Sequence, residues 1–222
     1  MDAQNHLETL FLLDEQGRIL STREPNPAPG PSLALILRAD SAAFALSVNV
    51  AEALARELRK VVVEEVPPPN LDQLPKHFDL YCELLGGAFE QYCAFEFAAV
   101  AATSERVVQV TDYSMLQKSF SGWTEDEIPE REPIMGIVSE GVLVSVCFCA
   151  RSSNRAAEAG VETVSQFRGQ GLAELVTGAW ASAIRASGRV PVYSTSVKNS
   201  SSRSVARKLG LVRCASYWFL NA

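Results

Sequence analysis

Two glutamates and a glycine alternate along one predicted strand, and they are the first residues of this sequence that could do chemistry. Successive side chains of a strand point to opposite faces, so Glu158, Gly160 and Glu162 share one face of the strand expected at 156–164. Burying unpaired carboxylates is costly, so this face must open into a cleft if the strand lies inside a sheet. The same pattern fits an edge strand whose polar face lies in solvent, and the spacing alone does not choose between the two.

A glycine turn follows that strand. Arg168-Gly169-Gln170-Gly171 precedes a predicted helix whose apolar residues recur at helical spacing: Leu172, Leu175, Val176, Ala179, Trp180, Ala183 and Ile184. Glycines let a backbone approach a ligand closely, and the first turn of a helix offers unpaired N–H groups and the positive end of its dipole. The turn therefore suits a pyrophosphate, with Arg168 as a nearby cation.

Two common phosphate-binding patterns are missing from this segment. A dinucleotide-binding fold needs a third glycine and an acidic residue at the end of the next strand, but the strand expected at 191–196 ends without Asp or Glu. A P-loop needs Gly-Lys-Ser/Thr, which is absent here. A general nucleotide-binding turn stays open, and it predicts stabilisation by NAD or ATP.

The elements that must position these residues predict an α/β protein of the α+β kind. In the second half, strands and helices follow one another in an order that indicates a mixed sheet with helices on its faces. The first half predicts hairpins at 7–21 and 33–48, then a helix that a capping box of Asn49 and Glu52 would begin. We expect residues 1–92 to form a small α+β domain of unknown role, and 93–222 to form the domain that carries the chemistry.

Composition excludes several classes of protein. Hydrophobic residues make up 47% of the 222 residues, so the chain has a buried core and is not disordered. With 20 Lys and Arg against 26 Asp and Glu, the net charge is −6, which disfavours nucleic acid and anionic membranes as partners. No apolar run is long enough to span a membrane, and the first residues do not resemble a signal peptide.

Cysteine usage points to a reducing compartment. The five cysteines are odd in number and scattered, which is typical of reduced core thiols in a cytoplasmic protein: Cys82, Cys93, Cys147, Cys149 and Cys214. Cys147 and Cys149 share a strand face, but both histidines lie far away in sequence. We therefore expect no metal site.

Here the sequence resembles a known family. Gln166-x-x-Gly169-x-Gly171 followed by Leu172-Ala173 is similar to the Q/R-x-x-G-x-G/A signature of the GNAT acyltransferase superfamily. Asn199 and Ser202, with Lys208-Leu209-Gly210-Leu211, resemble a later segment of that superfamily at the expected distance. The resemblance covers 93–222 and implies a GNAT-like mixed, mostly antiparallel sheet flanked by helices.

The resemblance also implies an activity and a set of site residues. It implies acyl transfer from acetyl-CoA to an amine, with the strand before the glycine turn splayed from its neighbour. By position, Val164 and Ser165 would offer backbone groups to the pantetheine arm, and Asn199, beside Ser202, would orient the arm or the acceptor. The pyrophosphate would lie on Arg168, Gly169, Gln170, Gly171, Leu172 and Ala173.

Two carboxylates are candidates for the proton transfer that an amine needs before it attacks a thioester. We expect Glu158 to be the base, acting through water, and Glu162 to be a helper or an anchor for a cationic substrate. Residues two and four apart rise about 6.6 and 13 Å along a strand, so the two glutamates cannot serve one atom directly.

One departure from the family pattern leaves alternatives open. Many relatives have a tyrosine seven positions after the asparagine to reprotonate the thiolate, but Ala206 stands there in this chain. Water, Tyr193, Ser196 or Tyr217 could take that part, or the protein could be an acyl-CoA-binding sensor without turnover. The acceptor is expected to be a small-molecule amine, a peptide N-terminus being a second enzyme alternative, and an exposed sheet edge could support a homodimer.

Overall fold

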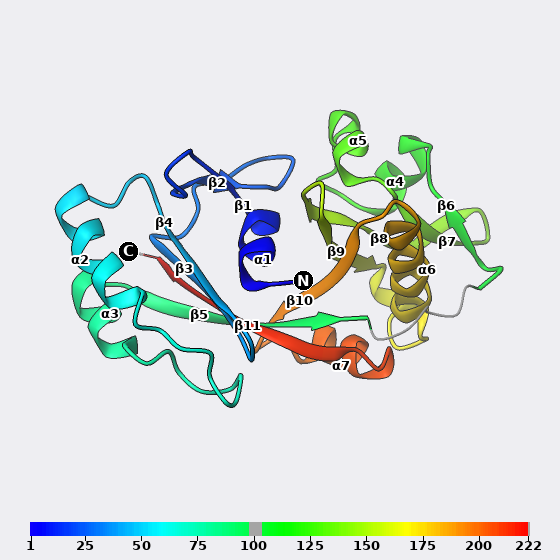
Figure 1. The fold of residues 1–222 in the computed structure, drawn as a ribbon. Helices are drawn as coiled ribbons and strands as arrows, with labels where there is room; N and C mark the ends of the chain where they lie inside the picture. The colour runs from blue at the N-terminus through cyan, green and yellow to red at the C-terminus, as the bar shows by residue number, and fades with distance from the viewer. Residues whose placement is uncertain (98–103, 222) are drawn as a thin grey trace.

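A long, twisted sheet organises the chain. The computed structural model describes residues 1–97 and 104–221, and within them nine strands form one sheet while β1 (Phe11–Leu13) and β2 (Ile19–Thr22) form a separate hairpin (Figure 1). In spatial order the strands of the large sheet are β4 (Ala42–Leu46), β3 (Leu33–Arg38), β11 (Val212–Asn221), β5 (Ala88–Glu96), β10 (Val190–Ser196), β9 (Ala156–Thr163), β8 (Val142–Ser152), β7 (Met135–Ser139) and β6 (Val107–Gln109). The helices are α1 (Ala3–Leu10), α2 (Glu52–Val62), α3 (Phe78–Leu85), α4 (Tyr113–Ser119), α5 (Ile128–Arg131), α6 (Leu172–Ala186) and α7 (Ser200–Lys208), with 3-10 turns η1 (Glu125–Glu127) and η2 (Ser165–Phe167).

The predicted fold class is confirmed. Every neighbouring pair of described strands in the large sheet is antiparallel except β9 and β10, which run parallel. The sheet is therefore mixed and mostly antiparallel. Strand β9 lies between β8 and β10, so the edge-strand alternative for the Glu158 strand is wrong.

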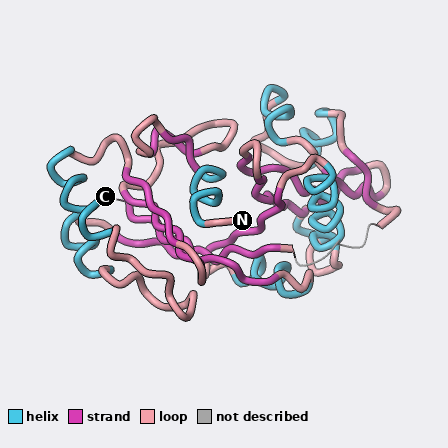
Figure 2. The backbone as a smooth tube through the Cα atoms, in the orientation of Figure 1, coloured by secondary structure: helices cyan, strands magenta, loops and turns pink. Residues whose placement is uncertain are grey.

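Helices cover both faces of the sheet, and Figure 2 shows them flanking the strands. The alternation along β8 shows the two faces directly: Cys147 and Cys149 pack beneath α6, whereas Val146 and Phe148 pack against α4 and α5. Alternation along β3 does the same at the other end, where Leu35 faces α2 and α3 and Ile36 faces α1. Strand alternation thus produces two apolar faces, each with its own layer of helices.

The sheet continues across the predicted domain boundary. Strand β5 runs through residues 92 and 93, and β3 from the first part pairs with β11 at the end of the chain. The helix α1 contacts β3 and β4 on one side and β8 and β9 on the other (Figure 1). Hydrogen bonding therefore joins both sides of residue 92, and a separate domain at 1–92 stays a prediction.

Two local predictions were wrong. Residues 7–10 form the end of α1 instead of a strand, because Ala3, Leu7 and Leu10 bury one helical stripe and Asp2 caps the helix by accepting a hydrogen bond from the Asn5 amide at 2.8 Å. Helix α2 begins at Glu52 after Ala51, without a side-chain cap, so Asn49 forms no capping box.

His6 lies on the buried face of α1 and is held neutral there. Its Nδ1 lies 2.6 Å from the Tyr217 hydroxyl and its Nε2 lies 3.2 Å from Arg38 Nη1. Burial, then the charges of Arg38 and the N-terminus, lower the pKa of His6 to about 3, and Asp2 opposes them. Because the folded-state pKa lies below the ordinary 6.5, the unfolded chain takes up the proton first as the pH falls.

Acid should therefore destabilise the fold through this one residue. The stability that neutral His6 contributes is complete above pH 6.5 and is lost as the pH falls toward 3, which amounts to about 2 kcal/mol between pH 7 and pH 5. Urea unfolding of His6→Gln at the two pH values should show a smaller drop than the parent by about that amount. Equal drops in the parent and in His6→Gln would contradict this assignment.

Candidate active site

Strands β9 and β10 separate part-way along their length. Their parallel pairing runs from Val190↔Ala156 to Val192↔Glu158 and then stops. Beyond that point β9 pairs only with β8, and β10 pairs only with β5. Backbone groups of residues 159–163 and 193–196 therefore face an opening inside the sheet, as the sequence resemblance led us to expect.

A cavity of about 930 Å³ occupies this opening. It is as large as the pockets that hold drug-sized ligands or cofactors. Its walls come from the splayed strands, the glycine turn, the starts of α6 and α7, and the end of α4. The predicted residues among them are Glu162, Val164, Ser165, Arg168, Gly169, Gly171, Leu172, Ala173, Asn199 and Ser202.

The glycine turn exposes the start of α6 to this cavity. Gly169 and Gly171 have φ of 78° and 79°, a left-handed conformation that side chains disfavour. Apart from the adjoining residues of the chain, nothing lies within 4 Å of a Cβ built at Gly169, and at Gly171 only Glu174 Oε2 comes as near as 4.0 Å. Gly171 ends the turn without a side-chain cap, so the first amides of α6 are available to an anion.

Three charged side chains surround that turn. Arg168 is exposed, and its Nε donates to the Thr163 carbonyl at 3.2 Å. Lys208 pairs with Glu174 at 2.8 Å, and both line the cavity. Lys208 therefore lies at the site, together with the glycine turn.

Asn199 begins α7. Its Oδ1 accepts hydrogen bonds from the Ser202 amide at 3.0 Å and the Ser201 hydroxyl at 2.8 Å, which caps the helix. The Ser202 hydroxyl lies 2.8 Å from the Tyr193 hydroxyl, also at the cavity. Burial raises the pKa of Tyr193, so its hydroxyl stays protonated and can donate.

Glu158 lies beside the cavity wall and is not itself among the lining residues. Its side chain is buried, with Oε2 2.8 Å from Arg151 Nη1 and Oε1 accepting a hydrogen bond from the Ser194 hydroxyl. Arg151 also pairs with Glu24. Ser194 lines the cavity, so it stands between that space and the Glu158 carboxylate.

The predicted shared face of Glu158, Gly160 and Glu162 is present. Phe148 covers its middle, and a Cβ at residue 160 would lie 2.5 Å from that ring, so only glycine fits there. Trp123 Nε1 donates to Glu162 Oε1 at 3.2 Å, which fixes the second carboxylate at the cavity. The structure thus separates the two glutamates by an aromatic ring.

The sequence did not predict some of these residues, and one residue that it did predict lies outside the cavity. Gln170 is exposed and does not line the cavity. Arg151 could have been found from the hairpin, because a two-residue turn between Ser153 and Ala156 gives a register that places Arg151 opposite Glu158. Ser194 had no local signal, since its position depends on pairing between distant strands.

The fold brings one group of possible metal ligands together among the described residues. Ligand atoms of His6, Glu96 and Cys214 lie within 4.8 Å of one another. Arg38 already points into this group, 2.9 Å from Glu96 Oε1 and 3.2 Å from His6 Nε2. A guanidinium at that position competes with a cation, and the expectation of no metal site stays a prediction.

Comparison with known proteins identifies the fold around the cavity. The model of the GNAT acetyltransferase family matches residues 135–220, a range that holds the splayed strands, the glycine turn and both following helices. The C-terminal half of this chain belongs to the GNAT acetyltransferase superfamily. It is therefore a domain of the acyltransferase class, and the predicted resemblance is confirmed. No curated protein matches the chain in sequence.

Solved structures of GNAT proteins share the fold over most of the chain. A GCN5-related N-acetyltransferase from Kribbella flavida is 16% identical, covers 99% of this chain and 93% of its own, and has a TM-score of 0.50. One from Sphaerobacter thermophilus is 14% identical over 85% and 76% of the two chains, with a TM-score of 0.51. A GNAT-family acetyltransferase from Colwellia psychrerythraea is 13% identical over 81% and 76%, also at 0.51.

Membrane insertion has no support from the helices. Within residues 1–97 and 104–221, none of them combines the length and the apolar character that crossing a bilayer requires.

Proposed function

We propose that this protein transfers an acetyl group from acetyl-CoA to a primary amine. The observation that carries the proposal is the cavity between β9 and β10, because it joins the uncapped start of α6 to Ser194 and hence to Glu158. The open space at Gly169 and Gly171 and the free amides of α6 fit a diphosphate, with Arg168 and Lys208 as cations nearby. Val164, Ser165, Leu172, Ala173, Asn199 and Ser202 would complete this binding surface.

Glu158 and Ser194 together would remove the proton from the acceptor. Bound acetyl-CoA supplies an activated carbonyl carbon and a sulfur leaving group. As the amine nitrogen forms its bond to that carbon, the carbon–sulfur bond breaks and its electron pair goes to sulfur. Ser194 Oγ takes the amine proton while its own proton passes to Glu158 Oε1, the acceptor of its hydrogen bond. Ser194 thereby takes the part that the sequence analysis gave to water.

Tyr193 would return a proton to the sulfur in place of the tyrosine that Ala206 replaces. Of the three side chains considered for this role, Tyr193 lines the cavity, whereas Tyr217 contacts His6 and Ser196 accepts a hydrogen bond from the Lys198 amide. The raised pKa of Tyr193 keeps its proton available. Glu162 remains our candidate for attracting a cationic acceptor.

Removing the Tyr193 hydroxyl should slow turnover moderately. We expect Tyr193→Phe to lower kcat about tenfold, less than the 10²–10⁴ of a typical acid–base group, because a thiol leaves readily without full protonation. Steady-state kinetics measure this, and Ser202→Ala, which removes the hydroxyl's neighbour but keeps the phenol, should retain more activity. If the kcat of Tyr193→Phe stayed within twofold of the parent, water and not Tyr193 would be the group that protonates the sulfur.

A non-catalytic acyl-CoA sensor is the second candidate, because Ala206 removes the usual acid and Arg151 already pairs with Glu158. The test adds acetyl-CoA and a panel of primary amines and measures free thiol, with thermal shifts recorded for acetyl-CoA, NAD and ATP. Thiol release that depends on the amine supports the enzyme. Stabilisation by acetyl-CoA without thiol release supports the sensor, and stabilisation by NAD or ATP alone supports a nucleotide-binding module.

The proposal includes a cytoplasmic location and a possible homodimer. All five cysteines are free thiols, which supports a cytoplasmic location. The strands β4 and β6 end the described sheet and offer edges through which two copies could pair.

A further inference from the structure

A second cavity lies on the far side of Ser194. It encloses about 170 Å³, less than the roughly 300–1,000 Å³ of pockets for drug-sized ligands. Its floor is made of aromatic side chains from β5 and β11, namely Tyr92, Tyr217 and Phe219, and its roof comes from Phe11, Pro29 and Pro31 near the start of the chain. The first ninety residues therefore build part of this cavity.

Hydrogen bonds and packing tie the proline-rich part of the roof to the hairpin of β1 and β2. Thr22 bonds Ala28 twice, at 2.9 Å through its amide and at 3.0 Å through its hydroxyl, which closes the proline-rich loop. Gly30 packs so tightly on Ile19 that a Cβ would lie 2.4 Å from the Ile19 side chain. Proline fixes its own φ, so this roof is rigid.

The inner end of the cavity meets the reaction centre proposed above. Ser194 lines both this cavity and the larger one. Arg151 lines the smaller cavity and pairs with both Glu158 and Glu24. A molecule in the smaller cavity would thus meet Ser194 from the side opposite the glycine turn.

The outer end of the cavity carries a carboxylate. Glu90 is exposed, and the Tyr92 hydroxyl donates to its Oε2 at 2.9 Å, which holds the carboxylate at the rim. Ser194 stands opposite Ala94 on β5, four residues from Glu90, so about 13 Å of strand separates the two ends. The charged residues that line the cavity are Glu90 and Arg151, and because Arg151 already pairs with Glu24 and Glu158, the Glu90 carboxylate is left to attract a cation at the outer end.

We propose that this cavity binds the acceptor as an elongated primary amine whose far end carries a second positive charge. The reacting nitrogen would lie at Ser194, the chain would cross the aromatic floor, and the far cation would pair with Glu90. Rings of Tyr92 and Phe219, tilted with centroids 5.2 Å apart, favour both an apolar chain and a cation. This inference rests on the proposed function only for which end of the amine reacts. The binding of the amine to the cavity does not depend on that function.

A series of equal-length probes tests the far-end charge. 1,8-Diaminooctane, octylamine and 8-aminooctanoate differ only at that end, which is positive, neutral or negative. We expect kcat/KM with acetyl-CoA to fall in that order, and titration calorimetry without any acyl donor to give the same order of affinity. Glu90→Gln should weaken 1,8-diaminooctane about three- to tenfold and leave octylamine unchanged, since an exposed ion pair contributes modestly.

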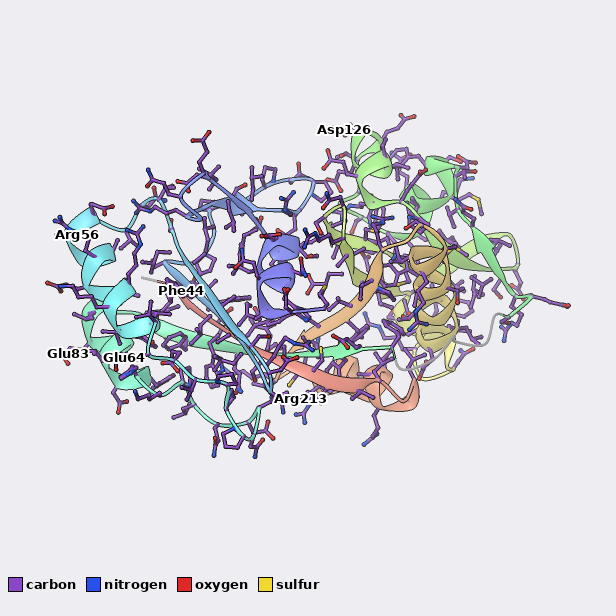
Figure 3. All side chains as sticks on the ribbon, in the orientation of Figure 1. Phe44, Arg56, Glu64, Glu83, Asp126 and Arg213 are labelled. Carbon is purple, nitrogen blue, oxygen red and sulfur yellow. The ribbon has the colours of Figure 1, made fainter. Side chains whose placement is uncertain are left out.

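Two further variants sharpen the test. Glu83→Gln removes another exposed carboxylate, on the outer side of α3 and away from the cavity (Figure 3), and should change nothing. Glu90→Lys should reverse the order and favour 8-aminooctanoate. Thiol release without any far-end preference, or with equal effects of Glu90→Gln and Glu83→Gln, would overturn this inference and leave the proposed function intact. Glu90-dependent diamine binding without thiol release would support the inference and count against the proposed activity.

Discussion

Glu158→Gln is expected to lower kcat by roughly 10²–10⁴-fold while the affinity for acetyl-CoA stays within about twofold of the parent. Glutamine keeps the shape of the side chain and an oxygen for the Ser194 hydroxyl, but it cannot take up a proton. Rapid-mix and steady-state kinetics measure the loss, and calorimetry measures the affinity. Ser194→Ala should cause a loss of similar size, and the double variant should be little worse than either, because residues that act as one unit are not additive.

The matched control for this prediction separates chemistry from folding. Glu158→Gln weakens a buried ion pair with Arg151, and breaking such a pair costs about 3–5 kcal/mol of stability. Glu24→Gln removes the other partner of Arg151 but leaves the Ser194–Glu158 hydrogen bond, so it should be destabilised yet remain active. If Glu24→Gln lost as much activity as Glu158→Gln, the loss would reflect disruption of the network around Arg151, and the base assignment would fail.

Gly171→Ala should weaken acetyl-CoA binding by about 10- to 100-fold, which is about 1.4–2.8 kcal/mol. The new methyl group would occupy the space before the first amides of α6, where we place the diphosphate, and no protein atom other than Glu174 Oε2, 4.0 Å away, lies near it. Titration calorimetry with acetyl-CoA measures the change directly.

The control lies at the other end of the same helix. Gly188 has φ of 80°, against 79° for Gly171, and an added Cβ there would likewise meet no close obstacle in the fold. Gly188→Ala should therefore carry the same cost of about 1–2 kcal/mol for a left-handed residue while binding acetyl-CoA normally. Equal affinities of the two variants would mean that the start of α6 does not hold the ligand.

Local patterns predicted the chemistry-bearing face well. Alternation along 156–163 predicted that Glu158, Gly160 and Glu162 share a face, and the glycines predicted the turn before α6. Strand alternation and turn formation depend only on residues that are neighbours in the sequence. The partners of Glu158 were harder to find. Arg151 follows from hairpin register, but Ser194 follows from a parallel pairing that no local pattern records.

The first ninety residues show the limit of sequence periodicity. Residues 7–13 read as one apolar strand, yet packing against β3 and β4 turns 7–10 into the end of α1. The pairing of β3 with β11 joins the first part of the chain to its last strand. Neither composition nor residue spacing predicts such a long-range contact. The smaller cavity, which needs Phe11, Pro29 and Tyr217 side by side, could not be predicted for the same reason.

An amide-resolved NMR titration with coenzyme A tests the central claim most directly. The claim predicts saturable shifts that are largest at Val164, Ser165 and residues 168–174, with β3 and β4 unaffected and with half-saturation below about 1 mM, the upper end of common KM values. Absence of shifts at the start of α6, or equal shifts there with NAD and ATP, would contradict it.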